Sequence, residues 1–228
     1  MNRVAFALAL TPLAPTLLGL GGCAHKPAAP VATIEAAPPQ PTGWRAIASA
    51  EDETRIDQLP GTWTRALALV QRRSRGKLAA ETKLVEPGAA LELPAPPPGP
   101  YRCRLVRFGG RASFQTFAPD FCYIDGDGKG VSFTKQTGSN LPGGWLHEDT
   151  PTRQVFLGSL PKPGATGVPR YGDDPAQDVA GVVERVSPFR WRLVLTRAGR
   201  GAVLDLYELV PVTPEVPGAK PAVPAPSS

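Results

Sequence analysis

Phe189-Arg-Trp-Arg-Leu-Val-Leu195 alternates apolar and basic side chains, the period-two pattern of a β-strand that is buried on one face. Trp191, Leu193 and Leu195 point to one side of such a strand, and Arg190 and Arg192 point to the other. The same period begins at Tyr101, which opens an alternating run with Cys103 and Leu105 on its apolar face. From residue 101 onward the sequence therefore predicts strands.

Further strand-like runs follow at short, regular intervals. They are 112–117, 121–124, 131–135, 144–147, 154–160, 179–185 and 202–210. Glycine- and proline-rich turn sequences separate them, among them 125–128 and 198–201. Eight or nine short strands joined in this way predict a mainly β fold, an antiparallel meander that closes into a small barrel of about eight strands. A β-sandwich is the alternative, and closure has the advantage of removing exposed strand edges.

One or two short helices are expected before the strands. Ser49 followed by Asp52 fits an N-cap with an acidic N3 residue, so a helix should begin near Ala50. Pro60-Gly61 should end it, and a second helix from about residue 62 should end at Gly76. Trp63 in this second helix is expected to pack in the core rather than to hold a ligand.

Residues 1–22 have the features of a targeting signal, with Arg3 ahead of a short, largely apolar run. The run ends in Leu20-Gly-Gly-Cys23, which resembles the lipobox of bacterial lipoproteins. That resemblance implies cleavage before Cys23 and lipidation of its thiol, and two or more acyl chains hold a protein stably on a membrane. The alternative is an ordinary signal peptide followed by a chance cysteine. Ala24 in place of an aspartate implies, by the same analogy, the periplasmic face of the outer membrane.

The 28 prolines and 24 glycines divide the chain into parts. We expect a signal peptide at 1–22, a Pro/Ala-rich tether at 23–42 and a Pro-rich disordered tail at 211–228. Between them lies one globular domain, 43–210. Its helical lead-in covers 43–93, a stiff Pro-rich connector covers 94–100, and its barrel-like part covers 101–210.

Cys103 and Cys122 are the two cysteines left after Cys23, and an oxidising compartment makes a disulfide between them the expected state. Closing a loop of this size stabilises the fold by about 3 kcal/mol. With His147 as the one histidine in the body of the chain, we expect no metal site and no cofactor. The formal charge of +5 is ordinary, so we expect no nucleic-acid partner.

No motif of the sequence predicts an enzyme. The acidic, glycine-rich segment 125–130 lacks the oxygen ligands that an EF-hand needs at loop positions five and twelve, so a hairpin turn is expected there. His147-Glu-Asp149 has no partnering nucleophile motif. A carboxylate pair such as Asp173 with Asp178 is the remaining route to a hydrolase.

The loop 161–177 is the strongest candidate for a binding surface, because loops of this length in compact domains are uncommon and often functional. Arg170, Tyr171, Asp173 and Asp174 combine an aromatic ring with both charges. The alternative is that the loop folds onto its own barrel, with Tyr171 plugging one end and Asp174 capping the turn before Pro175.

Several segments, taken in order, resemble the bacterial family called domain of unknown function 4893. They are Trp44-Arg45, 96–104, Gly144-Trp145, 155–158, 171–175, 180–185, 190–194 and Leu204-Asp205. The resemblance covers about residues 43–210 and implies no particular activity. Function must therefore be argued from the residues themselves.

Three functions remain open at the level of sequence. The first is a non-enzymatic envelope lipoprotein whose barrel binds a ligand or a protein partner, for example as an inhibitor of a periplasmic hydrolase, through the loop 161–177 and one barrel mouth. The second is a structural or accessory subunit of an envelope assembly, favoured by the Pro-rich ends. The third is a carboxylate-based hydrolase. In each case the lipid anchor makes the membrane a partner.

Overall fold

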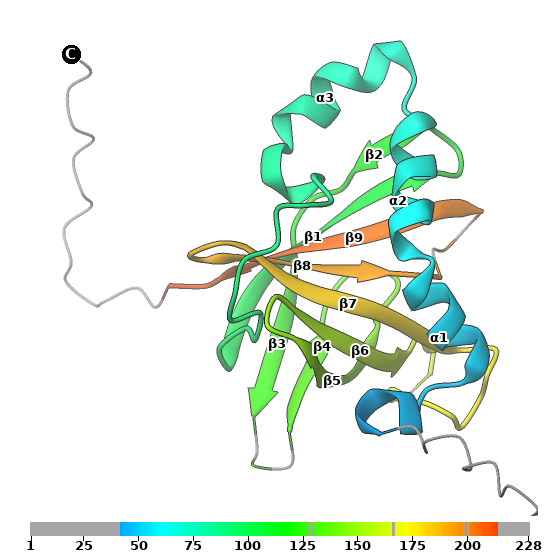
Figure 1. The fold of residues 1–228 in the computed structure, drawn as a ribbon, viewed down its shortest axis with the longest axis vertical. Helices are drawn as coiled ribbons and strands as arrows, with labels where there is room; N and C mark the ends of the chain where they lie inside the picture. The colour runs from blue at the N-terminus through cyan, green and yellow to red at the C-terminus, as the bar shows by residue number, and fades with distance from the viewer. Residues whose placement is uncertain are drawn as a thin grey trace, which may run out of the picture. The chain divides into compact units, whose positions relative to one another are not determined.

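The computed structural model describes residues 42–126, 128, 130–165, 167–197, 199 and 201–213. The predicted signal peptide 1–22, Cys23, almost all of the tether and nearly all of the tail lie outside the described residues. The helices all precede the strands (Figure 1). They are η1 (Gly43–Ala46), α1 (Ala50–Asp57), α2 (Leu59–Ala68), η2 (Arg72–Ser74), α3 (Arg75–Ala80) and η3 (Thr82–Leu84).

Helix α1 begins where the capping signal predicts. The Ser49 hydroxyl accepts a hydrogen bond from the Asp52 backbone N–H, and the acidic first turn favours the positive end of the helix dipole. Asp52 is nevertheless buried, because its carboxylate also accepts hydrogen bonds from Arg55 and Tyr171.

The predicted boundaries around α2 are wrong. Helix α2 begins at Leu59, with Pro60 in its first turn, where the missing N–H of proline leaves no hydrogen bond unmade. Gly61 therefore lies inside the helix rather than between two helices. Gly76 lies in α3 and does not cap α2, which ends eight residues earlier at Ala68. Trp63 is a core residue as predicted, and its indole N–H donates to the Val85 carbonyl.

Nine antiparallel strands follow in the described residues. They are β1 (Gly99–Gly109), β2 (Phe114–Thr116), β3 (Asp120–Gly126), β4 (Val131–Lys135), β5 (Gly143–Thr150), β6 (Arg153–Ser159), β7 (Asp178–Ser187), β8 (Arg190–Leu195) and β9 (Ala202–Pro211). Apart from β2, each strand pairs with the next one along the barrel, and β9 pairs with β1 over most of its length. Eight strands thus close into the predicted barrel, and β2 is an additional strand on β1. Strands β3 and β4 pair antiparallel as far as Gly126 and Val131, which makes them the expected hairpin.

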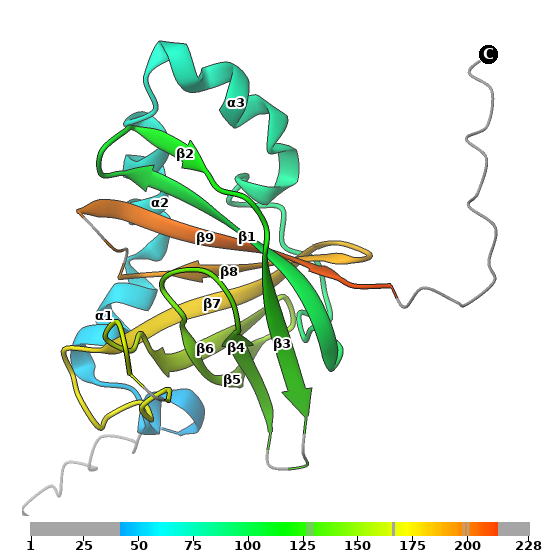
Figure 2. The same cartoon turned by 180° about the vertical axis from the view of Figure 1, so that it is seen from behind.

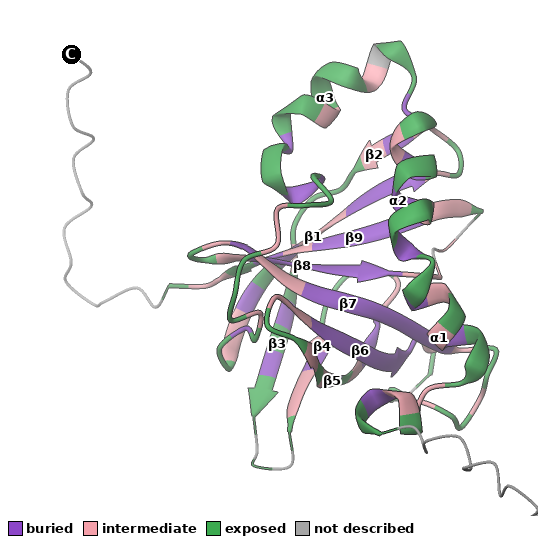
Figure 3. Ribbon diagram, viewed as in Figure 1, coloured by how far each residue is buried: buried purple, intermediate pink, exposed green. Residues whose placement is uncertain are grey.

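The two faces of β8, which the alternation at residues 189–195 predicts, belong to two different hydrophobic clusters. Trp191, Leu193 and Leu195 belong to the cluster inside the barrel. Val194, on the other face of β8, belongs to a second cluster that lies under the helices. Figure 3 shows buried residues on β7, β8 and β9 where α1 and α2 cross the outside of the barrel. The strands of this wall are therefore buried on both faces.

Two arginines join the helical lead-in to the outer face of the barrel. Arg192 is fully buried, pairs with Glu184, and donates to the carbonyls of Leu84 and Glu86. Its guanidinium also lies 4.4 Å from the centre of the Trp63 ring, within the range of a cation–π contact.

Arg104 makes the second connection, through two hydrogen bonds to the Glu81 carboxylate and one to Glu208. The two guanidinium groups thus bind six acceptor atoms of the segment 81–87 and fix it against β8 and β1, because a planar guanidinium offers several donors in one plane. The six are both Glu81 carboxylate oxygens and the carbonyls of Lys83, Leu84, Glu86 and Pro87.

Candidate functional site at one end of the barrel

The two ends of the barrel differ in their connections. At the end that we call the loop end, β1, β4, β6 and β8 finish and β3, β5, β7 and β9 begin. The loop end carries the connections 110–113, 117–119, 136–142, 160–177 and 196–201. In Figure 2 the β1–β2 hairpin lies at the upper left and the 160–177 connection at the lower left. The predicted binding loop is thus one of the loop-end connections.

A cavity of about 250 Å³ opens at the loop end. It lies between the β1–β2 hairpin and the 136–142 connection. It is lined by Leu105, Arg107, Gly110, Arg111, Gln115, Phe117, Asp120, Lys135, Ser139 and Asn140. Deeper inside, side chains such as Phe133, Phe156 and Tyr207 fill the barrel. The barrel mouth is therefore a shallow polar cavity above a packed core.

Arg107 and Asp205 form the first ion pair of this cavity. They lie opposite each other in the β1–β9 register, and both are buried. Two hydrogen bonds of 2.6 and 2.5 Å join the guanidinium to the carboxylate, and the Gly199 N–H donates to the same carboxylate. The hydrogen bond to Asp205 raises the pKa of Arg107, so the guanidinium stays protonated. The same hydrogen bonds hold it in one position.

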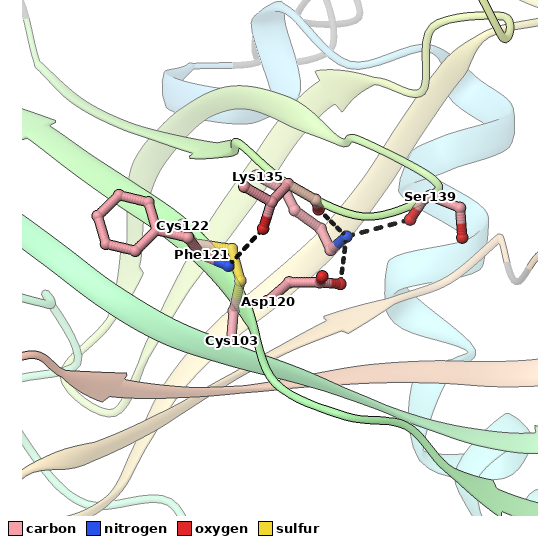
Figure 4. The surroundings of a disulfide bond; sticks show 7 residues. Cys103, Asp120, Phe121, Cys122, Lys135 and Ser139 are labelled. Atoms are coloured by element: carbon pink, nitrogen blue, oxygen red, sulfur yellow. Dashed lines mark hydrogen bonds and ion pairs between the residues drawn. A yellow bond between two sulfur atoms is a disulfide. The ribbon is translucent and has the colours of Figure 1, made fainter.

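Lys135 forms the second ion pair, with Asp120 at 2.7 Å (Figure 4). The Lys135 side chain is 1% exposed, and its ammonium also donates to the carbonyls of Thr137 and Ser139. Gly138 has φ +81°, and a Cβ there would collide with the Asp120 carboxylate. The 136–142 connection thus wraps closely around a buried, fully hydrogen-bonded ammonium.

The predicted disulfide lies beside this pair. Cys103 of β1 and Cys122 of β3 are bonded, with their Cα atoms 5.8 Å apart (Figure 4). Cys122 is opposite Lys135 in the β3–β4 register, and Cys103 is opposite Asp120 in the β1–β3 register. The cross-link therefore joins the two strands that carry one wall of the cavity.

Strand parity in the sequence places these charged residues on the inner face of the barrel. Arg107 shares the strand parity of Tyr101, Cys103 and Leu105, the residues predicted to face the barrel interior. Asp205 likewise shares the parity of Tyr207 and Leu209, and Lys135 that of Phe133. A charged residue on an apolar face must find a partner, because leaving it unpaired costs several kcal/mol.

The four predicted binding residues lie near one another in the loop 161–177, but none of them lines the loop-end cavity. Tyr171 packs against the outer cluster, and its hydroxyl donates to Asp52 at 2.7 Å and accepts from the Ser49 N–H at 2.9 Å. Burial raises the pKa of Tyr171. Tyr171 therefore ties the loop to the start of α1, on the outside of the barrel.

The neighbours of Tyr171 shape the loop itself. Asp173 accepts a hydrogen bond from the Arg170 N–H, and Asp174 accepts from the Ala176 N–H and the Gln177 side chain. The hydrogen bond from Gln177 lowers the pKa of Asp174. These contacts match the alternative in which the loop folds onto its own barrel, although Tyr171 packs against α1 outside the barrel and does not plug one of its ends. A binding role for the four residues stays a prediction.

The residues considered for catalysis come from two places in the chain, His147 from β5 and the two aspartates from the 160–177 connection and the start of β7. His147 lies on the face of β5 opposite to Leu146, outside the barrel interior, and burial lowers its pKa. Asp178 accepts two hydrogen bonds from the Gly172 N–H, and burial raises its pKa. Asp173 and Asp178 thus each serve a backbone N–H of the same loop.

Metal-binding clusters and membrane-spanning helices are both absent from the described residues. No group of three or more His, Cys, Asp or Glu side chains in this part of the chain is arranged to hold a metal ion. Among the helices between residues 42 and 213, none is long and apolar enough to cross a membrane.

Together these features define a small closed antiparallel β-barrel with a helical cover and a charged, shallow mouth. A family model, the domain of unknown function 4893, matches residues 44–209, so the chain belongs to that family. No curated protein and no solved structure matches the chain. The match begins at Trp44, whose indole N–H donates to Asp149 at 2.8 Å, and ends at Leu209 of β9. The family thus comprises the helical cover together with the barrel.

Proposed function

We propose that this chain is a lipid-anchored protein on the periplasmic face of the bacterial outer membrane, whose barrel binds a protein partner at the loop end without catalysing a reaction. The Leu20-Gly-Gly-Cys23 sequence supports the anchor, and Ala24 supports the outer membrane. An inhibitor of a periplasmic hydrolase is one specific form of this proposal.

The loop-end cavity is the observation that carries the binding role. Arg107 and Lys135 are buried cations, each held by a carboxylate, so the floor of the cavity is shaped and charged before any partner arrives. A surface that is already ordered loses less entropy on binding. At about 250 Å³ the cavity is smaller than most pockets for drug-sized ligands, and its size suits one inserted side chain of a partner.

The rim of the cavity indicates the chemistry of that side chain. Arg111 is exposed, and Phe117 offers a partly exposed ring that lies 5.9 Å from the Arg107 guanidinium. Three cations and two carboxylates line or support the cavity, so its net charge is positive. An acidic side chain flanked by apolar residues fits this arrangement best.

Photo-crosslinking in the lipidated full-length chain tests the proposal. A photoreactive residue at Gln115 should give one discrete adduct with an envelope protein. Arg111→Glu should abolish the adduct, because it reverses the charge of the rim. Arg102→Glu is the matched control, since Arg102 is exposed on β1 outside the cavity. Equal loss in both variants, or no adduct at Gln115, would contradict the proposal.

The anchor is tested separately by Cys23→Ala. The variant should leave the membrane fraction or remain uncleaved. Normal processing and membrane fractionation of Cys23→Ala would overturn the anchor while leaving the binding proposal untouched.

Deleting the loop 161–177 is a poor test, because Tyr171 holds α1 in place and the deletion would damage the fold. The accessory-subunit alternative assigns the function to the tail instead. Removing residues 214–228 separates the two roles: the Gln115 adduct should persist if the loop end binds the partner.

A further inference from the structure

The opposite end of the barrel carries a second surface, which we call the connector-end groove. It has a volume of about 490 Å³ and lies between the Pro-rich connector, the β7–β8 hairpin and the end of β9. Tyr101, Trp191 and Phe189 supply aromatic side chains, and Pro98 and Pro211 add apolar surface. The groove is therefore built from rings, in contrast to the charged loop end.

Two large apolar side chains at the groove are exposed to solvent. Phe189 is 76% exposed and Leu93 is 75% exposed, although both are large hydrophobic residues. Leu93 also has φ +58°, a strained conformation for a leucine, and its N–H donates to the Pro151 carbonyl. Exposed apolar side chains gathered around one groove are typical of a binding surface.

Trp191 is a reporter for the groove, because its ring lines the groove wall. It is buried, and its indole N–H has no hydrogen-bond partner among the described residues. Its neighbour Tyr101, by contrast, donates its hydroxyl hydrogen bond to the Pro97 carbonyl at 2.7 Å. The indole nitrogen is enclosed by the protein, so an occupant of the groove would contact the ring of Trp191 rather than this nitrogen, and would shield the N–H further from water.

The chain itself holds a segment of matching chemistry. The described part ends at Thr213, immediately after Val212, which lines the groove and donates its N–H to the Pro100 carbonyl. Residues 214–228 read Pro-Glu-Val-Pro-Gly-Ala-Lys-Pro-Ala-Val-Pro-Ala-Pro-Ser-Ser. Pro217-Gly218 has the signature of a type II turn, which reverses the chain direction.

After that turn comes Pro221-Ala-Val-Pro224, a Pro-x-x-Pro sequence. Such sequences favour the polyproline II conformation, lose little entropy on docking, and bind grooves lined by aromatic rings. Residues 221–226 carry no charge. The one charged residue of the groove, Arg185, is already engaged by the Glu92 carbonyl.

We propose that the connector-end groove is a binding site for an extended proline-rich segment, and that residues 219–226 of the same chain occupy it. The Pro217-Gly218 turn returns the tail over the end of β9. Prolines 221 and 224 then pack on the aromatic rings of Tyr101, Phe189 and Trp191. Because the tail is tethered beside the groove, its effective concentration is high, in the millimolar range for short flexible linkers.

The indole N–H signal of Trp191 in NMR spectra of the full chain tests this proposal. The signal is assigned with Trp191→Phe, and its hydrogen exchange is compared with that of a chain ending at Thr213. Truncation should speed the exchange about tenfold, the effect of losing about 1.4 kcal/mol of protection. Unchanged exchange and chemical shift would overturn the proposal.

Three further arms keep the test informative. Pro221→Ala with Pro224→Ala should reproduce the truncation, whereas Pro214→Ala, which precedes the turn, should not. Phe189→Ser, an exposed position that leaves the fold intact, should also release the tail. A synthetic peptide of residues 219–228 should restore the Trp191 signal of the truncated chain and leave the full chain unchanged.

The concentration dependence identifies the source of the segment. The signal of the full chain should not change on dilution, because the tail binds within its own chain. A signal that changes on dilution would mean that the tail binds a second copy, which contradicts the proposal. Loss of the loop-end adduct bears on the proposed function alone, since the two sites lie at opposite ends of the barrel.

Discussion

At the loop end, Arg107 and Lys135 are buried cations with carboxylate partners and further hydrogen bonds from neighbouring backbone. At the connector end, Trp191 and Gln154 are buried and each has one polar atom without a partner among the described residues. The difference separates two ways of preparing a surface for binding. The buried charges of the loop end all have partners before any binding event, whereas the connector end offers exposed apolar rings and retains two buried polar atoms without a partner among the described residues.

Breaking the Arg107–Asp205 pair should have the largest effect. Asp205→Ala leaves the Arg107 guanidinium buried without its counter-charge, so the free energy of unfolding should fall by about 3–5 kcal/mol. Urea denaturation of the purified chain measures the loss. Arg111→Ala in the same cavity should change it by less than about 0.5 kcal/mol, because Arg111 is exposed.

Asp205→Ala removes both the counter-charge of Arg107 and some packed volume. The double variant Arg107→Met with Asp205→Leu shows which of the two losses destabilises the fold. It should recover most of the stability, since replacing both members of a buried pair avoids an unpaired charge. A loss in the double variant as large as in Asp205→Ala would contradict this explanation.

The disulfide under the cavity should have the next largest effect. Cys103→Ala with Cys122→Ala should reduce the free energy of unfolding by about 3 kcal/mol, because the unfolded chain regains the entropy of an open loop. Wild-type protein unfolded in the presence of a reducing agent is the matched control. Its urea midpoint should equal that of the double cysteine variant. An unchanged midpoint in both would show that the cross-link does not limit the unfolded chain.

The barrel could be predicted from sequence because the signals for it lie within short stretches of the chain. Each strand is joined to the next by a short turn, and period-two alternation separates the two faces, as residues 189–195 show. The disulfide could be predicted as well, because few cysteines leave few pairings. Strand parity would also have placed Arg107, Lys135 and Asp205 inside the barrel.

Other features had no comparable signal. The hydroxyl of Tyr171 meets Ser49 and Asp52 across more than one hundred residues, and no spacing rule connects them. Arg192 binds backbone carbonyls, which every residue carries, so its partners at 84 and 86 cannot be read from side-chain types. Pro60-Gly61 was misread as a break because a proline in a first helical turn and a proline between helices look alike in sequence.

The smallest effect should come from Gln154 at the connector end, and there the sign should be reversed. Gln154 faces the barrel interior on β6, and its Oε1 is buried without a partner in the described part of the chain. Gln154→Met keeps the length of the side chain and removes the unpaired acceptor. The free energy of unfolding should stay unchanged or rise by up to about 1 kcal/mol, measured by urea denaturation.

Gln154→Glu is the matched control, because it keeps the shape and adds a buried charge that should clearly destabilise the fold. A loss of more than about 1 kcal/mol in Gln154→Met would mean that the amide is satisfied in solution, by water or by another segment of the chain. The connector end would then be as complete as the loop end, and the contrast between them would rest on Trp191 alone. If Gln154→Met leaves the free energy of unfolding unchanged or raises it, the unpaired Gln154 acceptor destabilises the connector end, where we propose that the tail docks.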